Sequence, residues 1–168
     1  MSFEELYNQI APKLTNYLVG SGCSYANACD IVQETFLRVW KKRDTLKDDL
    51  SQVSGYIYTV ARNIRIDRMR KESFETLQPE IRDEDAGTVE PAVMRGDAEH
   101  LRKRIEEAMA QLPPLVREAF SLFQISEMSV REISKLTGAS ESLVKVRVHR
   151  AKQKLRELLS DICRGEGD

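Results

Sequence analysis

Apolar side chains recur every three or four residues along most of this chain, which is the spacing of one face of an α-helix. The repeats are Phe3, Leu6, Tyr7 and Ile10; Ala28, Ile31, Val32, Phe36 and Val39; Ile57, Val60, Ala61 and Ile64; and Val144, Val148, Ala151, Leu155 and Leu158. None of these segments shows the strict alternation of apolar and polar residues that is typical of a half-buried strand. The sequence therefore predicts an all-α protein.

The charge of the chain is unevenly distributed. Residues 72–99 carry nine acids against two bases, a local net charge of −7, although the whole 168-residue chain has a net charge of only −1. The segments 1–71 and 100–168 are each +3 by the same count. This pattern predicts two small helical domains, at residues 1–73 and 92–168, joined by a flexible acidic linker at residues 74–91.

Several classes of protein are disfavoured by what the sequence lacks. The acidic start, Ser2-Phe3-Glu4-Glu5, leads into no long apolar run, so we expect a cytoplasmic protein without membrane insertion. The three cysteines form no C-x-x-C pair and have no histidine nearby, so we expect neither disulfides nor a metal site, but buried or incidental thiols. No glycine-rich phosphate loop or paired nucleophile and base occurs, which favours a protein that is not an enzyme and needs no cofactor.

The segment DIVQETFLRVW, Asp30 to Trp40, is predicted to be a helix with two different faces. One face holds the apolar repeat. The other combines acids, an amide, a leucine and a base: Asp30, Gln33, Glu34, Leu37 and Arg38. A face that only meets water seldom needs this mixture, so we interpret it as a docking surface for another protein.

A predicted helix at residues 53–71 turns basic residues outward, opposite its apolar repeat. These are Arg62, Arg65 and Arg70, with Asn63 among them and with Arg68 and Lys71 nearby at the C-terminal end. Arginines can hold phosphates, and an amide can both donate to and accept from a base edge, so this face suits nucleic acid. The alternative is a solvated cationic face, which the helix dipole would favour near a helix C-terminus.

The segment 129–158 has the spacing of a helix-turn-helix. Ser129 and Glu132 form a capping box, Gly138 suits a tight turn, and a long second helix begins at about Ser140 or Glu141. Its outward residues are Lys145, Arg147, His149, Arg150, Lys152, Lys154 and Arg156. Such a helix can read base edges with its early turns and hold phosphates with later ones. An ordinary amphipathic helix pair is the alternative.

Five segments in this order resemble the extracytoplasmic-function (ECF) sigma factors of bacterial RNA polymerase. They are DIVQETFLRVW, YIYTVARNIRIDRMRK, the acidic linker, QLPPLVREAF and SVREISKLTGASESLVKVRVHRAKQKLREL. The resemblance implies a factor that binds core RNA polymerase and directs promoter-specific initiation. Its first domain, sigma region 2, would read the minus-ten element, and its second, sigma region 4, would read the minus-thirty-five element. An anti-sigma factor is a further implied partner.

The resemblance also implies residue roles. Core polymerase would contact Asp30, Gln33, Glu34, Leu37 and Arg38. The minus-ten strand, including one unstacked base, would meet Tyr56, Tyr58, Arg62, Asn63, Arg65 and Arg68, although either tyrosine can instead belong to the core. The minus-thirty-five element would meet Lys145, Val146, Arg147, His149 and Arg150.

Three alternatives stay open at this stage. Val146 replaces a small hydroxyl residue common in the family, and it can meet a thymine methyl group or simply pack. The acidic linker can mimic nucleic acid inside the polymerase or act as a solubilising tether. The whole chain can also be an ordinary helix-turn-helix repressor or activator, which would bind duplex DNA without polymerase.

Overall fold

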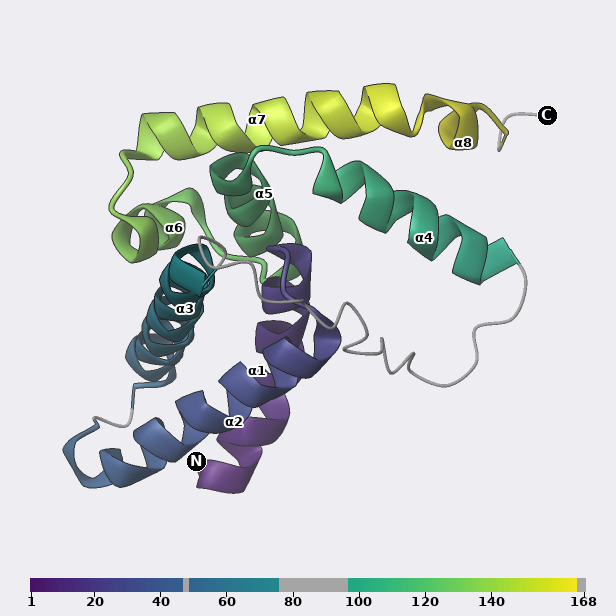
Figure 1. The fold of residues 1–168 in the computed structure, drawn as a ribbon. Coiled ribbons are helices and arrows are strands. Elements are labelled where there is room, and N and C mark those ends of the chain that lie inside the picture. The colour runs from purple at the N-terminus through teal and green to yellow at the C-terminus, as the bar shows by residue number, and fades with distance from the viewer. Residues whose placement is uncertain (47–48, 76–96, 166–168) are drawn as a thin grey trace. The chain divides into compact units, whose positions relative to one another are not determined.

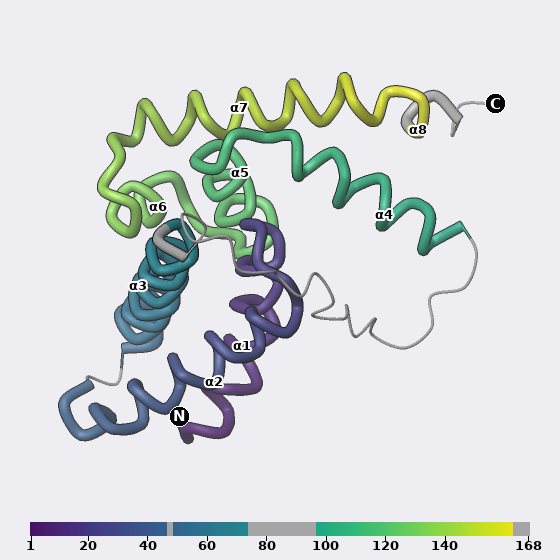
Figure 2. Tube along the Cα trace, viewed as in Figure 1, coloured from purple at the N-terminus to yellow at the C-terminus, as the bar shows by residue number. Residues whose placement is uncertain are grey.

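The computed structural model describes residues 1–46, 49–75 and 97–165, and these are helical with no strand among them (Figures 1 and 2). The all-α prediction is confirmed for this part of the chain. Most of the predicted linker, from residue 76 onward, lies outside the described residues. The helices divide between two compact units, of which the first contains α1 to α3 and the second contains α4 to α8.

Three long helices and one 3-10 turn build the first unit. They are α1 at Phe3–Gly20, α2 at Tyr25–Lys41, η1 at Arg43–Thr45 and α3 at Leu50–Glu75. The capping box at the start of α1 is present, because the Glu5 backbone N–H donates to Ser2 Oγ at 3.1 Å and the Ser2 N–H donates to Glu5 at 2.7 Å. Ser24 caps α2 by accepting from the Asn27 N–H at 3.2 Å.

The apolar repeats of α2 and α3 lie in the core of the first unit, whereas of the predicted repeat in α1 only Ile10 is buried and Tyr7 is 40 % exposed. Ala28, Ile31, Val32, Phe36 and Val39 of α2 are buried, as the periodicity predicts. The helix α2 packs against α3, and aromatic rings join α1 to α2, with Phe3 and Tyr7 placed edge-on to Phe36. Burial of the inner face leaves the opposite face of α2 to present its polar side chains.

The helix α3 is longer than the predicted helix at residues 53–71. It begins three residues earlier, at Leu50, and continues to Glu75, two residues into the predicted linker. Asp49 extends its start, because the Asp49 carboxylate accepts the Ser51 N–H at 3.0 Å. At the other end, the sequence from Lys71 to Glu75 contains no glycine or proline that would stop a helix.

The second unit contains the predicted helix-turn-helix. Its elements are α4 at Asp97–Ala110, α5 at Pro114–Phe120, the π-helical turn η2 at Ser121–Ile125, α6 at Val130–Thr137, α7 at Glu141–Leu158 and α8 at Ser160–Gly165. Both α5 and α6 pack against α7. The core between α4, α5 and α7 comprises Met109, Leu112, Val116 and Ala151, with Phe120 and Leu155 against it. The π-helical turn was not predicted.

The turn between α6 and α7 has the geometry that the sequence predicts. The capping box of Ser129 and Glu132 starts α6, and Ser140 starts α7 by accepting from the Leu143 N–H at 3.1 Å. Gly138 ends α6 in the left-handed region, with φ of 78°. These three local signals together fix where the second helix of the pair begins.

We expect Gly138→Ala to lower the stability of the second unit through backbone conformation alone. A Cβ at this position would meet no atom within 4 Å, so its cost of about 1 kcal/mol comes from holding a residue other than glycine at positive φ. Thermal unfolding followed by circular dichroism should show a midpoint lower by about 4–8 °C for a unit of this size.

Gly138→Asn is the matched control, because asparagine tolerates the left-handed region better than alanine. Its midpoint should lie between those of the wild type and Gly138→Ala. An alanine variant as stable as the wild type would contradict the role given to this glycine.

Candidate nucleic-acid interface and docking surface

The outward face of α2 carries the predicted docking residues. Asp30, Gln33, Leu37 and Arg38 are exposed, and Glu34 is half-buried. Leu37 is 61 % exposed, the most of any large apolar side chain in the described residues apart from Met1. A leucine in that position gains nothing from the core of its own unit, so it is available for burial against another molecule.

Glu34 differs from its neighbours because it already holds two arginines. One carboxylate oxygen accepts from Arg38 at 2.6 Å, and the other accepts from Arg68 of α3 at 3.1 Å. Partial burial raises the pKa of Glu34, but the hydrogen bonds from Arg68 and Arg38 outweigh it and hold the pKa below its ordinary value. The carboxylate therefore stays charged at neutral pH and ties the docking face of α2 to the basic face of α3.

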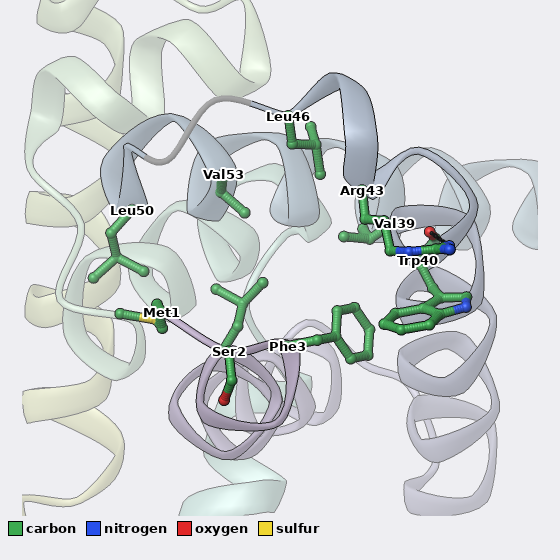
Figure 3. Close-up of a pocket in the computed structure, with 10 residues that line it drawn as sticks. Met1, Ser2, Phe3, Val39, Trp40, Arg43, Leu46, Leu50 and Val53 are labelled. Atoms are coloured by element: carbon green, nitrogen blue, oxygen red, sulfur yellow. Dashed lines mark hydrogen bonds between the residues drawn. The ribbon is translucent and has the colours of Figure 1, made fainter.

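A pocket of about 320 Å³ opens where the start of α1, the end of α2 and the start of α3 meet. Figure 3 shows Phe3, Trp40 and Arg43 along one side, and Met1 and Leu50 along the other. The rings of Phe3 and Trp40 lie 4.8 Å apart, and the Arg43 guanidinium lies 4.1 Å from the centroid of the Trp40 ring. Aromatic edges beside a cation suit a flat apolar group.

The basic face of α3 is only partly as predicted. Asn63 is exposed, and Arg62, Arg68 and Tyr56 of the same helix are half-buried. An amide at Asn63, set between two arginines on one helix, can hydrogen-bond a base edge while the arginines hold phosphates.

Two of the predicted strand contacts lie inside the first unit instead. Tyr58 is 3 % exposed and packs against Tyr17, with ring centroids 5.6 Å apart. Arg65 is 7 % exposed, lies 6.0 Å from the Tyr17 ring centroid and donates to Met69 Sδ at 3.6 Å. The tyrosine follows the core alternative that the sequence left open. Arg65 was expected in solvent and is buried instead, in the packing of α3 against the rest of the first unit, where Tyr17 of α1 lies near it.

The predicted reading residues lie on the early turns of α7. Lys145, Val146, His149 and Arg150 are exposed, and Arg147 is half-buried. Val144, Val148 and Ala151 form the buried stripe on the opposite side, as predicted. The arrangement leaves a cationic helix face that begins directly after the turn at Gly138, which is the geometry that major-groove reading requires.

Sequence reasoning missed two exposed apolar side chains at these surfaces. Trp40 is 44 % exposed at the end of the docking helix, and Leu143 is 40 % exposed in the first turn of α7. Both fall within segments that the sequence singled out. In the sequence, each is an apolar residue that falls outside the repeat of buried positions. Periodicity alone does not tell such an exposed residue from one at the edge of the buried face.

Among residues 1–46, 49–75 and 97–165, no group of three or more histidines, cysteines or acids is placed to hold a metal ion. Within the same residues, no helix combines the length and the apolar character needed to cross a bilayer.

Comparison with known families gives two matches along the chain. The family described as Sigma-70 region 2 matches residues 6–75, which cover most of the first unit. The family described as Sigma-70, region 4 matches residues 102–155, which include α5, α6 and most of α7. Both the docking helix and the helix-turn-helix therefore lie inside matched regions.

Curated relatives match the chain nearly end to end. The ECF RNA polymerase sigma factor RpoE of Cereibacter sphaeroides is 29 % identical over 163 residues, covering 95 % of this chain and 87 % of the relative. The RNA polymerase sigma factor CarQ of Myxococcus xanthus is 30 % identical over 161 residues, covering 96 % and 91 %. Among solved structures, the sigma factor RpoE in complex with the anti-sigma factor NepR from Bartonella quintana has a TM-score of 0.74 at 23 % identity, covering 94 % of this chain and 96 % of that one.

Proposed function

The chain belongs to the ECF sigma factors of bacterial RNA polymerase, and we propose that α2 binds core polymerase while α3 and α7 read promoter DNA. As a sigma factor it directs promoter-specific transcription initiation. The observation that carries the proposal is the presence of both regions on one chain in this order, each over a unit with an exposed basic helix. A repressor or activator with an N-terminal interaction domain would leave the docking face of α2 and the face of α3 around Asn63 unused.

The docking face of α2 has the composition expected of a protein interface. Leu37 supplies an exposed apolar anchor, and Asp30 and Gln33 beside it supply polar contacts around it. Glu34 and Arg38 already bind each other, so we assign them a supporting role in which they hold the helix surface in shape. Core polymerase is the partner that the family assigns to this helix.

We assign the minus-ten element to the middle of α3, around the exposed Asn63. Asn63 would hydrogen-bond a base that leaves the stack, and Arg62 would hold the strand. Arg68 already binds Glu34, so we assign it the same supporting role as Arg38. Tyr56 remains a weaker candidate because it is half-buried. Tyr58 and Arg65 are left out, since burial keeps both from the strand in this conformation.

Asn63→Ala is expected to slow open-complex formation about tenfold, which corresponds to loss of a hydrogen bond whose base partner would then be left unsatisfied. Initial binding of the closed duplex should change less than twofold, because the base is still stacked at that stage. Permanganate reactivity of unpaired thymines would follow opening, and gel retardation would follow initial binding.

Asn16→Ala is the matched control, since Asn16 is also an exposed amide in the first unit but lies on α1. It should open the promoter at the wild-type rate. Equal loss of closed-complex binding and opening in Asn63→Ala would contradict the assignment to an unstacked base.

We assign the minus-thirty-five element to the early turns of α7. Lys145 and His149 reach outward where base edges would lie, and Arg150, further along, would hold a phosphate. The half-buried Arg147 lies at the margin of this face. The left-handed turn at Gly138 sets the entry angle of the helix.

The proposed partners and cellular location follow from the role of a sigma factor. We propose that the chain supplies no catalytic group, because the chemistry of RNA synthesis belongs to the polymerase. It would act in the cytoplasm, where polymerase and promoter meet. We propose that an anti-sigma factor controls it by covering surfaces that otherwise bind polymerase or DNA. The solved complex of the sigma factor RpoE with the anti-sigma factor NepR supports this class of partner.

Promoter binding with and without core polymerase tests the proposal against a self-sufficient repressor. The isolated chain should bind promoter DNA weakly. Core polymerase should raise the affinity for the promoter at least about a hundredfold, which is a coupling free energy of roughly 2.7 kcal/mol, and should make the binding specific for the promoter sequence. Tight sequence-specific binding by the isolated chain, unchanged by core polymerase, would reject the sigma-factor assignment in favour of the repressor.

A further inference from the structure

Val146 lies at the centre of the outward face of α7. It is two residues from Val144 on one side and from Val148 on the other, and two residues correspond to about 200° around a helix. Both of those valines are buried, so Val146 projects away from the core, and it is 42 % exposed. The alternative in which Val146 simply packs is therefore wrong for this structure.

Leu143 extends the same apolar patch toward the turn. It precedes Val146 by three residues, which places the two side chains side by side on the helix surface, with Cβ atoms about 5–6 Å apart. Leu143 is 40 % exposed. Two branched apolar side chains thus occupy the first two turns of a helix whose exposed surface is otherwise polar or basic.

The surroundings of this patch favour an anionic partner. From Ser142 to Arg156 the helix contains no acid, and Lys145, His149 and Arg150 are exposed beside the patch. The acids of α7, Glu141 and Glu157, lie at its two ends, so a protein partner would have to supply acids for these bases as well as an apolar surface for Leu143 and Val146. Duplex DNA provides phosphates for the bases and, in the major groove, one apolar group for Leu143 and Val146, the 5-methyl group of thymine.

We infer that Leu143 and Val146 read thymine methyl groups at two neighbouring base pairs of the minus-thirty-five element. The inference rests on the proposed function, because it requires α7 to enter the major groove. It adds that the groups that this chain selects in the minus-thirty-five element are thymine methyl groups. Neighbouring here means one or two base-pair steps apart, since side chains about 5–6 Å apart span one or two steps of 3.4 Å along a strand.

The test uses holoenzyme, made from core polymerase and the full chain, and selects binders from a randomised duplex library. The selected minus-thirty-five half should contain thymines at two neighbouring base pairs. Replacing each thymine by deoxyuridine, which removes only the methyl group, should weaken binding about fourfold, as for a buried group of that size. In double-mutant cycles that combine each protein variant with each uracil substitution, Val146→Ser should abolish the loss of affinity caused by uracil at one of the two positions. Leu143→Ser should abolish the loss of affinity caused by uracil at the other position.

Gln153→Ser is the matched control, because Gln153 is exposed on the same face of α7, two turns beyond Val146, and carries no branched apolar group. Its discrimination between thymine and uracil should equal that of the wild type. Sequence-specific binding that is equally strong with uracil at every position would overturn the inference and leave the proposed function intact. Methyl discrimination that survives both serine substitutions would overturn it as well. A library that yields no motif at all would instead count against the proposed function.

Discussion

Replacing Leu37 with aspartate is expected to weaken the binding of core RNA polymerase about 30-fold or more, the effect of losing an interface hot spot. The substitution removes the apolar anchor of the docking face and places a charge where the polymerase would exclude water. The fold should tolerate it, because Leu37 is 61 % exposed and contributes little to the core. Fluorescence anisotropy of the labelled chain, titrated with core polymerase, would measure the dissociation constant.

The control for this prediction adds the same charge elsewhere in the first unit. Asn16→Asp also introduces one acid at an exposed position, on α1 rather than α2. It should bind core polymerase as the wild type does. Similar affinities for Leu37→Asp and Asn16→Asp, with both proteins folded by circular dichroism, would show that α2 is not the docking helix.

Arg150→Ala is expected to weaken holoenzyme binding to a promoter about tenfold, as for the loss of a hydrogen bond to a charged group. Arg150 is exposed on the third turn of α7, beyond the residues placed to read bases. If it holds a phosphate, the loss should be similar for all promoter sequences. The slope of log affinity against log salt concentration should also become shallower by about one.

Lys103→Ala provides the comparison for Arg150. Lys103 is exposed on α4 in the same unit, so its removal changes the overall charge equally but lies on a different helix. It should leave both the affinity and the salt slope nearly unchanged. A loss for Arg150→Ala that is confined to one promoter base, with the slope unaltered, would reassign this arginine from a phosphate to a base edge.

The parts of the fold that local chemistry determines were predictable from the sequence. The capping box at Ser129 and Glu132, the left-handed turn at Gly138 and the buried stripes of α2 and α7 all follow from residue type and spacing within a few turns. The π-helical turn after α5 was not predicted, because neither the residue types nor their spacing distinguish this segment from an ordinary helix end.

The exposure of a candidate site residue was predictable only where its neighbours belong to its own helix. Arg65 lies on the polar side of its helix in sequence, yet it is buried in the packing of α3 against the rest of the first unit, which periodicity within α3 does not reveal. The bridge from Glu34 to Arg68 joins residues 34 positions apart and likewise needs the packed helices. The exposure of Val146, in contrast, excludes burial in the core of its own unit, and its contact with a thymine methyl group stays a proposal.

Run-off transcription tests the central claim most directly. Core polymerase, nucleotides and a promoter selected with the holoenzyme should yield a transcript of one defined length when the chain is present, and none when it is omitted. The Leu37→Asp protein should give little transcript under the same conditions, and the Asn16→Asp protein should give the wild-type amount. Absence of a transcript with the folded wild-type chain, on a promoter that its holoenzyme occupies, would contradict the assignment of this protein as a sigma factor.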